Sequence, residues 1–163
     1  MASRLRMFGG IALAAALASS AQAQGLVIEK NISLAMAQTI ATAAMEKCKE
    51  MGFKVSVTVV DRFGLPIVML RGDGVGLHTP EGSDRKAYTA RTFRAPSADF
   101  VKRMLNDPAA VGSKEYTRVL ALGGGLPIMA GDDVVGAVGV SGSPGRDDEC
   151  SKAGIDKVAD QLK

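Results

Sequence analysis

Tryptophan is absent from this chain of 163 residues, which contains only two tyrosines and five phenylalanines. Proteins that bind single-stranded nucleic acid stack the bases on aromatic side chains, so this scarcity argues against such a platform. His78 is the single histidine of the chain, and there are two cysteines. These residues do not have the ligand spacing of a zinc site, and the chain lacks the Cys-x-x-Cys-His signature of covalently attached haem.

Glycine-rich stretches are present, but they lack the spacing of phosphate-binding loops. Residues 123–125 are three glycines without the Gly-x-Gly-x-x-Gly or P-loop pattern, and they precede an expected strand rather than a helix. Residues 139–143 resemble a nucleophile elbow, but Ser143 stands where that motif needs its second glycine. A serine hydrolase also needs a histidine beside its nucleophile, and His78 lies in an expected loop. The sequence therefore favours neither a nucleotide-binding nor a serine hydrolase site.

The N-terminus has the three-part pattern of a secretory signal peptide. Arg4 and Arg6 form a basic start, residues 8–18 form an uncharged apolar run, and Ala21 and Ala23 fit the small-x-small cleavage pattern. The apolar run is much shorter than the roughly 20 residues of a bilayer-spanning helix. We expect a cleaved leader, the alternative being a buried N-terminal helix.

We therefore predict a signal peptide over residues 1–23 and a single domain over residues 24–163, periplasmic or secreted. The leader contains two basic residues and no acidic ones, so its removal lowers the formal net charge from +3 by two, to +1. A nearly neutral chain offers no electrostatic attraction for nucleic acid or for an anionic membrane. We expect no nucleic-acid partner and no membrane span.

Apolar periodicity divides the mature chain into helices and strands. Ser33 can cap a helix whose apolar residues recur every three or four positions, and Gly52 ends it. Val55, Val57 and Val59 alternate with polar residues, which is typical of a strand. We expect helices at 34–51, 85–94, 97–105 and 147–162, and strands at 54–60, 65–70, 119–122, 126–129 and 134–140.

This element order predicts an α/β (α+β) domain with a five-stranded antiparallel sheet flanked by helices, the first and last helices sharing one face. Pro66, near the start of the second strand, predicts an edge position for that strand. Residues 131–133, Gly-Asp-Asp, predict a turn that joins the last two strands. Ser97 is expected to cap the helix that follows Pro96.

Residues 71–82 contain four glycines and a proline and are expected to form a loop. Charged residues concentrate at the end of the second strand, in this glycine-rich loop and on the next helix: Arg71, Asp73, His78, Asp84, Arg85, Lys86 and Arg91. Lys86, Thr89 and Phe93 share one face of that helix by their spacing. Cations beside apolar groups suit an amphipathic ligand that carries carboxylates, such as haem or a small organic acid. His78 could be a single axial ligand to haem iron. The alternatives are a solvated helix face and an exposed histidine without a role.

Several separated motifs follow one another along the chain: VSVTVVDRFG (55–64), RGDG (71–74), RKAYTA (85–90), Phe93, Pro96-Ser97, GGLPI (124–128), VGAVGVSG (135–142) and Asp148-Glu149. Together they resemble the GlcG/HbpS family, whose members are described as haem-binding or haem-degrading proteins. The resemblance implies a three-layer fold on a five-stranded antiparallel sheet, and homo-oligomers. Residues 75–80 depart from the family pattern, so His78 is nominated as a ligand from this sequence alone.

The resemblance implies an exported binding protein for haem or a similar tetrapyrrole, acting in storage, scavenging or sensing, rather than an enzyme. The site residues that this sequence itself offers for such a ligand are His78, Arg71, Lys86, Tyr88, Thr89 and Phe93, with His78 as the metal ligand. Arg71, Lys86 and Arg91 would neutralise propionates, and His78 or Tyr88 would approach the iron.

Two alternatives to haem binding stay open. One is an enzyme or binder for a small carboxylic acid in the same cleft, with Asp61 or Asp73 as acid or base and Arg71 or Lys86 as a carboxylate clamp. The other is an interaction protein whose function is its own multimer.

Cys48 and Cys150 are expected to form a disulfide. An even pair of cysteines in an oxidising compartment is more often bridged than free. Cys48 lies on the apolar stripe of the first helix and Cys150 in the first turn of the last helix. If these helices run antiparallel on one face, the two cysteines meet. The alternative is a pair of buried free thiols.

Overall fold

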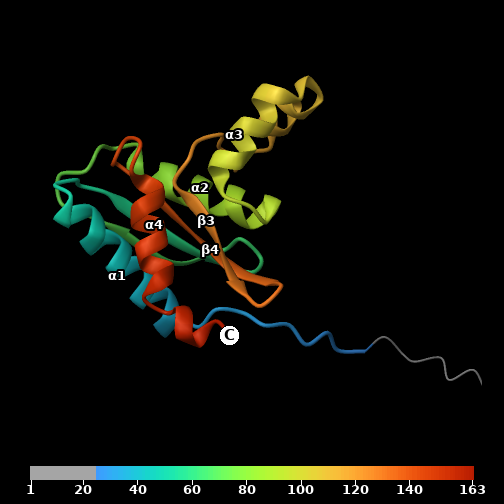
Figure 1. Ribbon diagram of the computed structural model, residues 1–163, viewed down its shortest axis with the longest axis horizontal. Coiled ribbons are helices and arrows are strands. Elements are labelled where there is room, and N and C mark those ends of the chain that lie inside the picture. Colours follow the sequence, from blue (N-terminus) through green and yellow to red (C-terminus); the bar gives the residue numbers. More distant parts are fainter. Residues whose placement is uncertain (1–24) are drawn as a thin grey trace, which may run out of the picture.

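The computed structural model describes residues 25–163, so the predicted signal peptide over residues 1–23 lies outside the described residues (Figure 1). The elements are α1 (Leu34–Glu50), β1 (Ser56–Asp61), β2 (Pro66–Arg71), α2 (Thr79–Phe93), α3 (Ser97–Asn106), the 3-10 helix η1 (Pro108–Glu115), β3 (Gly125–Ala130), β4 (Asp133–Ser141), α4 (Asp147–Asp156) and the 3-10 turn η2 (Ala159–Gln161). Within residues 25–163, no helix is both long and apolar enough to cross a membrane.

The four strands form one antiparallel sheet in the order β2-β1-β4-β3. β2 lies at an edge, as Pro66 predicts, because proline has no N–H to donate to a second neighbour. The hairpin between β3 and β4 is also confirmed, and Gly131 supplies the positive φ that its turn requires. β1 and β4 are the two central strands and are almost entirely buried.

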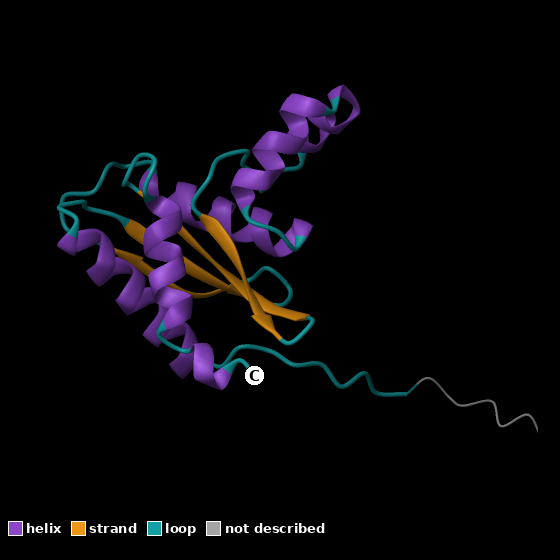
Figure 2. Ribbon diagram, viewed as in Figure 1, coloured by secondary structure: helices purple, strands orange, loops and turns teal. Residues whose placement is uncertain are grey.

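Helices cover both faces of the sheet, which gives the domain three layers (Figure 2). α1 and α4 pack side by side on one face, so the prediction that the first and last helices share a face is confirmed. Val55, Val57 and Val59 join the apolar core with residues of these two helices. Ser33 caps α1 by accepting a hydrogen bond from the Met36 N–H, as predicted.

α2 covers the other face and touches bare backbone of the sheet. A Cβ atom at Gly139 of β4 would collide with the Ser83 carbonyl and with the backbone of Ala87. A Cβ atom at Gly125 of β3 would collide with the Lys86 carbonyl. The close packing of α2 on the sheet therefore depends on glycine at these two strand positions.

The expected fifth strand over residues 119–122 is wrong, because this segment is an irregular loop that bends at Leu122, whose N–H donates to the Leu120 carbonyl. The Leu120 N–H donates to the Thr89 hydroxyl at 2.9 Å, and the Leu122 carbonyl accepts from the Ser97 hydroxyl at 2.7 Å. Side chains of α2 and α3 thus satisfy backbone groups that a strand would have paired with a neighbour. The sheet has four strands rather than five.

α2 begins at Thr79, six residues before the expected start at Arg85. Pro80 occupies the first turn, where the missing N–H of proline costs nothing. Gly82, interpreted as a loop residue, lies inside the helix and contacts the Ser141 side chain, where a Cβ atom would not fit. The end of the expected glycine-rich loop is therefore helical. The helix lies close to the sheet there.

Two further helix boundaries differ from expectation. The N-cap of α3 is Pro96, and the hydroxyl of Ser97 is used by the segment before β3 instead of capping. α4 ends at Asp156 rather than at Leu162, and η2 follows it.

Candidate functional site

Two pockets lie at one end of the sheet, where β1 begins and β2 and β4 end; Ser56 pairs with Arg71 on one side and with Ser141 on the other. The first, which we name the His78 pocket, has a volume of about 370 Å³. Its lining residues are His78, Lys86, Leu122, Gly123, Ser141, Gly142, Pro144, Gly145, Asp147 and Asp148. Two of the predicted site residues, His78 and Lys86, thus line one pocket.

The base of the His78 pocket is a buried ion pair. The Lys86 side chain is 1% exposed, and its Nζ lies 2.7 Å from Oδ2 of Asp147. The same ammonium group donates to the carbonyl of Val140 at 3.1 Å. A buried charge is tolerated only when it is paired and hydrogen-bonded, and both conditions hold here. Lys86 is therefore engaged by the protein itself and points away from solvent.

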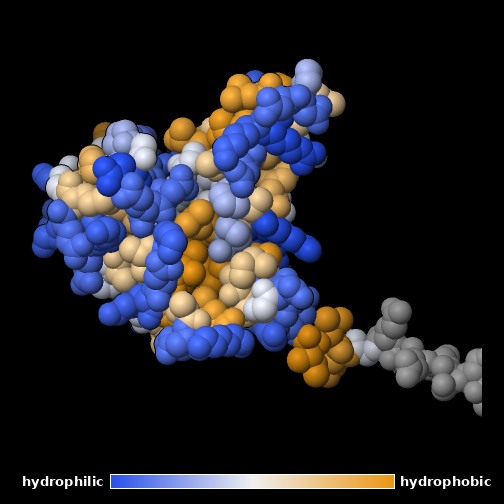
Figure 3. Space-filling view, in the orientation of Figure 1, coloured by the Kyte–Doolittle hydropathy of each residue, from blue (hydrophilic) through white to orange (hydrophobic). Residues whose placement is uncertain are grey.

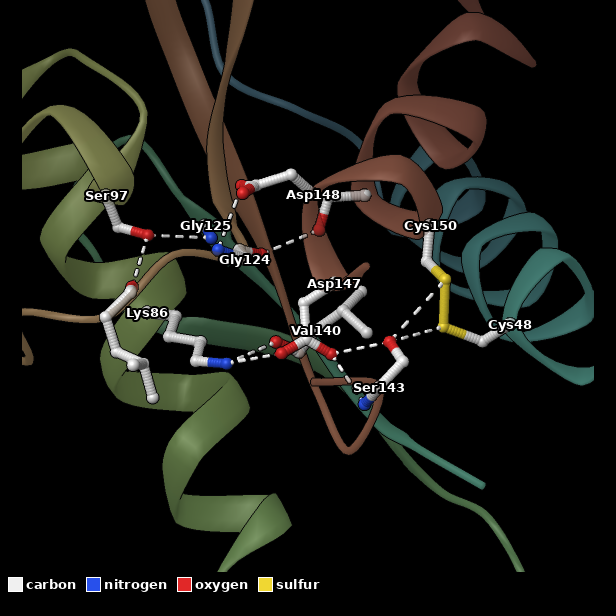
Figure 4. A network of polar contacts seen from close by, with 12 residues as sticks. Cys48, Lys86, Ser97, Gly124, Gly125, Val140, Ser143, Asp147, Asp148 and Cys150 are labelled. Atoms are coloured by element: carbon white, nitrogen blue, oxygen red, sulfur yellow. Dashed lines mark hydrogen bonds and ion pairs between the residues drawn. A yellow bond between two sulfur atoms is a disulfide. The ribbon is translucent and has the colours of Figure 1, made fainter. Parts of the chain in front are cut away.

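The second carboxylate oxygen of Asp147 connects the ion pair, through Ser143, to the disulfide (Figure 4). Oδ1 of Asp147 accepts from both the N–H and the hydroxyl of Ser143, at 2.9 and 2.7 Å. The Ser143 oxygen also lies 3.2 Å from Sγ of Cys48. Because the disulfide sulfur carries no proton and the hydroxyl proton is used by Asp147, this is a close polar contact, not a hydrogen bond.

The predicted disulfide between Cys48 and Cys150 is confirmed, with Cα atoms 5.5 Å apart. That separation lies within the usual range for disulfides. The bond joins α1 to the first turn of α4, and both cysteines are fully buried. It therefore fixes the start of α4, which carries Asp147.

Residues 123–125 form one wall of the pocket and are held by side chains of two helices. The Gly124 N–H donates to Asp148, and the Gly125 N–H donates to the Ser97 hydroxyl, both at 2.9 Å. The hydroxyl of Ser151 donates to the Gly124 carbonyl at 2.7 Å. These hydrogen bonds fix the glycine backbone as one wall of the pocket.

His78 stands at the mouth of the pocket. It is the residue before α2, it is exposed, and its side chain makes no capping hydrogen bond. Its ring lies over Gly76, where a Cβ atom would come within 2.8 Å of the imidazole. An imidazole of this kind has a ring nitrogen free to bind a metal. Within residues 25–163 there is no group of three or more His, Cys, Asp or Glu side chains placed to hold a metal ion by itself.

Arg71 and Asp73 line the second pocket, on the α1 side of the same sheet end. We name it the Phe53 pocket; its volume is about 530 Å³. Its lining residues are Met45, Lys49, Gly52, Phe53, Lys54, Val55, Arg71, Gly72 and Asp73. The Lys54–Val55 backbone separates it from the His78 pocket, because Gly142 packs directly against that backbone.

The structure places the other three predicted residues away from both pockets. Tyr88 lies under the guanidinium of Arg118, 4.2 Å from the ring centroid, and beside Gly64. Thr89 is buried and supports the loop at 119–122. Phe93 stacks on Phe100 of α3 with centroids 4.3 Å apart.

Asp61 and Arg91 lie at the opposite end of the sheet. Asp61 accepts hydrogen bonds from the N–H groups of Phe63 and Leu65, so it supports the turn between β1 and β2. Burial, followed by the neighbouring Arg62 and Arg94, lowers the pKa of Arg91 from its usual value. Because Asp61 and Arg71 lie at opposite ends of the sheet, they cannot act together on one small ligand.

Sequence reasoning missed Asp147 and Ser143 as parts of the pocket base. The acidic run at 147–149 suits the first turn of a helix, where the helix dipole favours acidic residues, so it does not by itself point to Lys86. The available signal was Lys86 itself, because it falls on the buried stripe of α2 with Ser83, Ala87 and Ala90. A lysine on an apolar stripe needs a buried anionic partner.

Known proteins share this fold and much of this sequence. Protein GlcG of Escherichia coli strain K12 is 29% identical over 110 residues, covering 68% of this chain and 81% of its own. The crystal structure of a double mutant of Streptomyces reticuli HbpS is 33% identical, with a TM-score of 0.76, and covers 96% of this chain and 97% of that one. A crystal structure of a PduOC–haem complex has the same fold at 23% identity, with a TM-score of 0.71 and coverage of 78% and 94%.

A family model described as "Haem degrading protein HbpS-like" matches residues 32–156, which include every strand and both pockets. The chain belongs to this HbpS-like family.

Proposed function

We propose that this protein is an exported binding protein for haem or a similar tetrapyrrole, with the His78 pocket as its binding site. The observation that carries the proposal is an unengaged histidine at the mouth of a pocket in a chain of the HbpS-like family. Imidazole is a common axial ligand of haem iron. When bound, haem would supply the redox chemistry of its iron, and His78 would hold that iron from one side.

The pocket walls fit a flat, largely apolar ring. Leu122 and Pro144 supply apolar surface, and Gly123, Gly142 and Gly145 bring bare backbone to the surface where a planar ligand can approach closely. Because His78 is exposed and the pocket is open, the ring would be partly exposed rather than enclosed. PduOC, which shares the fold, has been solved in complex with haem.

In this proposal, Lys86 and Arg71, which were predicted to bind the propionates, have other roles. Lys86 is already paired with Asp147, so it shapes the base of the pocket instead of binding a propionate. Arg71 lines the separate Phe53 pocket. Tyr88, Thr89 and Phe93 support the α2 layer at a distance from His78.

Export is supported by the N-terminal sequence pattern and by the disulfide. Disulfides persist in oxidising compartments and are rare in the cytosol. The roles open to such a protein are storage, scavenging and sensing of haem.

The homo-oligomer stays a prediction, and exposed apolar surface supports it. Figure 3 shows hydrophobic atoms where the described chain begins, next to the grey residues. In that segment Leu26, Val27 and Ile28 are between 81% and 99% exposed. Phe63 and Leu65 beside edge strand β2 are also exposed. Large apolar side chains that are exposed in the single chain are often covered in an assembly. Light scattering of the mature protein would measure its mass in solution.

Titration with haemin tests the binding site. We expect a sharp Soret band for the wild type, and a shifted band with at least about tenfold weaker binding for His78→Ala, because the axial ligand is lost. Leu77→Ala is the matched control, since Leu77 is the exposed neighbour of His78 and lies outside the pocket lining. Identical spectra and affinities for wild type and His78→Ala would reject His78 as the ligand. Binding no stronger than that of an unrelated protein of similar size without a haem site, such as lysozyme, would reject the proposed function.

A further inference from the structure

We propose that the Phe53 pocket is a separate binding site for a small amphipathic organic anion, with a carboxylate bound by Arg71 and the lysines and an apolar body resting on Phe53 and Met45. This site does not depend on the haem proposal, because neither His78 nor any other residue of the His78 pocket lines it.

The charge of the pocket is positive and is not neutralised by the protein. Lys49, Lys54 and Arg71 line it with one carboxylate, Asp73, which gives a net charge of three minus one, or +2. Across residues 25–163, none of these four side chains forms an ion pair. Cations gathered around a concave surface without partners attract an anion.

The C-terminus of α1 does not neutralise the charge of these cations either. Its last carbonyls, those of Lys47, Cys48 and Lys49, accept hydrogen bonds from the N–H groups of residues 51–53. The partial negative charge of a helix C-terminus amounts to about half a unit, which is smaller than the net charge of the three cations and Asp73. The pocket therefore keeps an excess of positive charge.

The base of the pocket is apolar. Val55 is 2% exposed, and Phe53 and Met45 are half-buried against the core. An aromatic ring and a thioether present an apolar surface that adapts to a chain or a ring. The combination of an apolar base and a cationic rim is what a medium-chain fatty acid or an aryl carboxylate requires.

The cations come from three segments that the fold brings together. Lys49 belongs to the last turn of α1, Lys54 to the loop before β1, and Arg71 to the end of β2. The Lys54 ammonium group lies over Gly74, where a Cβ atom would come within 3.0 Å of it. The loop after β2 thus contacts the Lys54 ammonium group, and Lys54 and Arg71 both line the pocket.

Calorimetric titration with octanoate tests the site in the mature protein. We expect one octanoate per chain, with affinity that falls as sodium chloride is raised, because ions screen exposed charges. Octanol and octylamine have the same tail without the anionic group, and we expect them to bind at least about tenfold more weakly, the scale of a charge-assisted hydrogen bond.

Arg71→Gln should weaken octanoate binding by about tenfold or more, and Arg103→Gln should leave it unchanged. Arg103 is an exposed arginine of α3 remote from the pocket, so it controls for the loss of one positive charge. Lys54→Gln, in an exposed loop, is a second variant if circular dichroism shows that Arg71→Gln is unfolded.

Equal octanoate affinity in wild type and in the folded variant would overturn the proposal. So would equal binding of octanol and octanoate. The haemin titration with His78→Ala uses different residues, so either proposal can fail without the other.

Discussion

Asp147→Asn should be among the most destabilising conservative substitutions in this protein. The asparagine side chain has nearly the same shape but leaves the Lys86 ammonium group buried without a counter-charge. Removing one partner of a buried ion pair typically costs about 3–5 kcal/mol. A domain of this size has a total stability of roughly 5–15 kcal/mol. We therefore expect a loss of roughly a third of the stability, or about 10–20 °C in melting temperature.

Lys86→Met/Asp147→Asn should be more stable than the sum of the single losses predicts. Methionine fills the aliphatic space of lysine without a charge, so the double variant leaves no unpaired ion at the base of the His78 pocket. Replacing both members of a buried pair is often nearly neutral. The single variants and the double variant form a cycle whose interaction energy should reach about 1–3 kcal/mol.

Urea unfolding followed by circular dichroism measures all four free energies. Asp156→Asn is the matched control, because Asp156 pairs with Lys152 on the exposed side of α4, where an ion pair contributes at most about 1 kcal/mol. If Asp147→Asn costs no more than this control, or if the two single losses simply add, the ion pair does not stabilise the pocket base.

Three further predictions concern other parts of the chain. Cys48→Ala/Cys150→Ala removes a cross-link between residues 102 apart and should lower unfolding stability in guanidinium by up to about 4–5 kcal/mol; a loss below about 1 kcal/mol would contradict the loop-entropy reasoning. The hydrogen bond from Arg146 lowers the pKa of Glu149, so this pair stabilises the fold above the unfolded-state pKa of about 4.3 and loses that effect as the pH falls through the lower folded pKa; Glu149→Gln should flatten this part of the stability–pH curve, and an unchanged curve would refute it. Exported protein should have the intact mass of a chain that starts at Gln24, and a mass that includes the leader would contradict cleavage.

Local sequence signals predicted the elements whose side chains repeat with a clear period. The stripe of α1, the alternating valines of β1 and the glycine turn between β3 and β4 are each visible in a short stretch of sequence. The disulfide was predictable because the two cysteines fall near the ends of helices that the element order places together. Local periodicity and cysteine position were sufficient in these cases.

The remaining features depend on contacts between distant residues. Residues 119–122 have strand-like composition, but Thr89 and Ser97 take their backbone groups, and no local pattern reveals this. The true start of α2 was hidden because glycine is unfavourable inside a helix, and the reason for Gly82, its close contact with Ser141 of β4, is visible only in the fold. Likewise, Asp147 has the sequence signature of an ordinary acidic residue at a helix start, and only the fold turns it toward Lys86.

The direct contact between α2 and the glycines of the sheet limits how this fold can evolve new specificity. The usual route to an internal cavity is to shorten a core side chain, and at Gly139 and Gly125 there is no side chain left to shorten. Adding one would push the helix off the sheet. Variation in ligand preference must then accumulate where strands give way to loops, as in residues 72–78, because these can change composition without moving a layer. The middle of the domain cannot change its packing easily, so we expect differences in ligand specificity to arise at one end of the sheet.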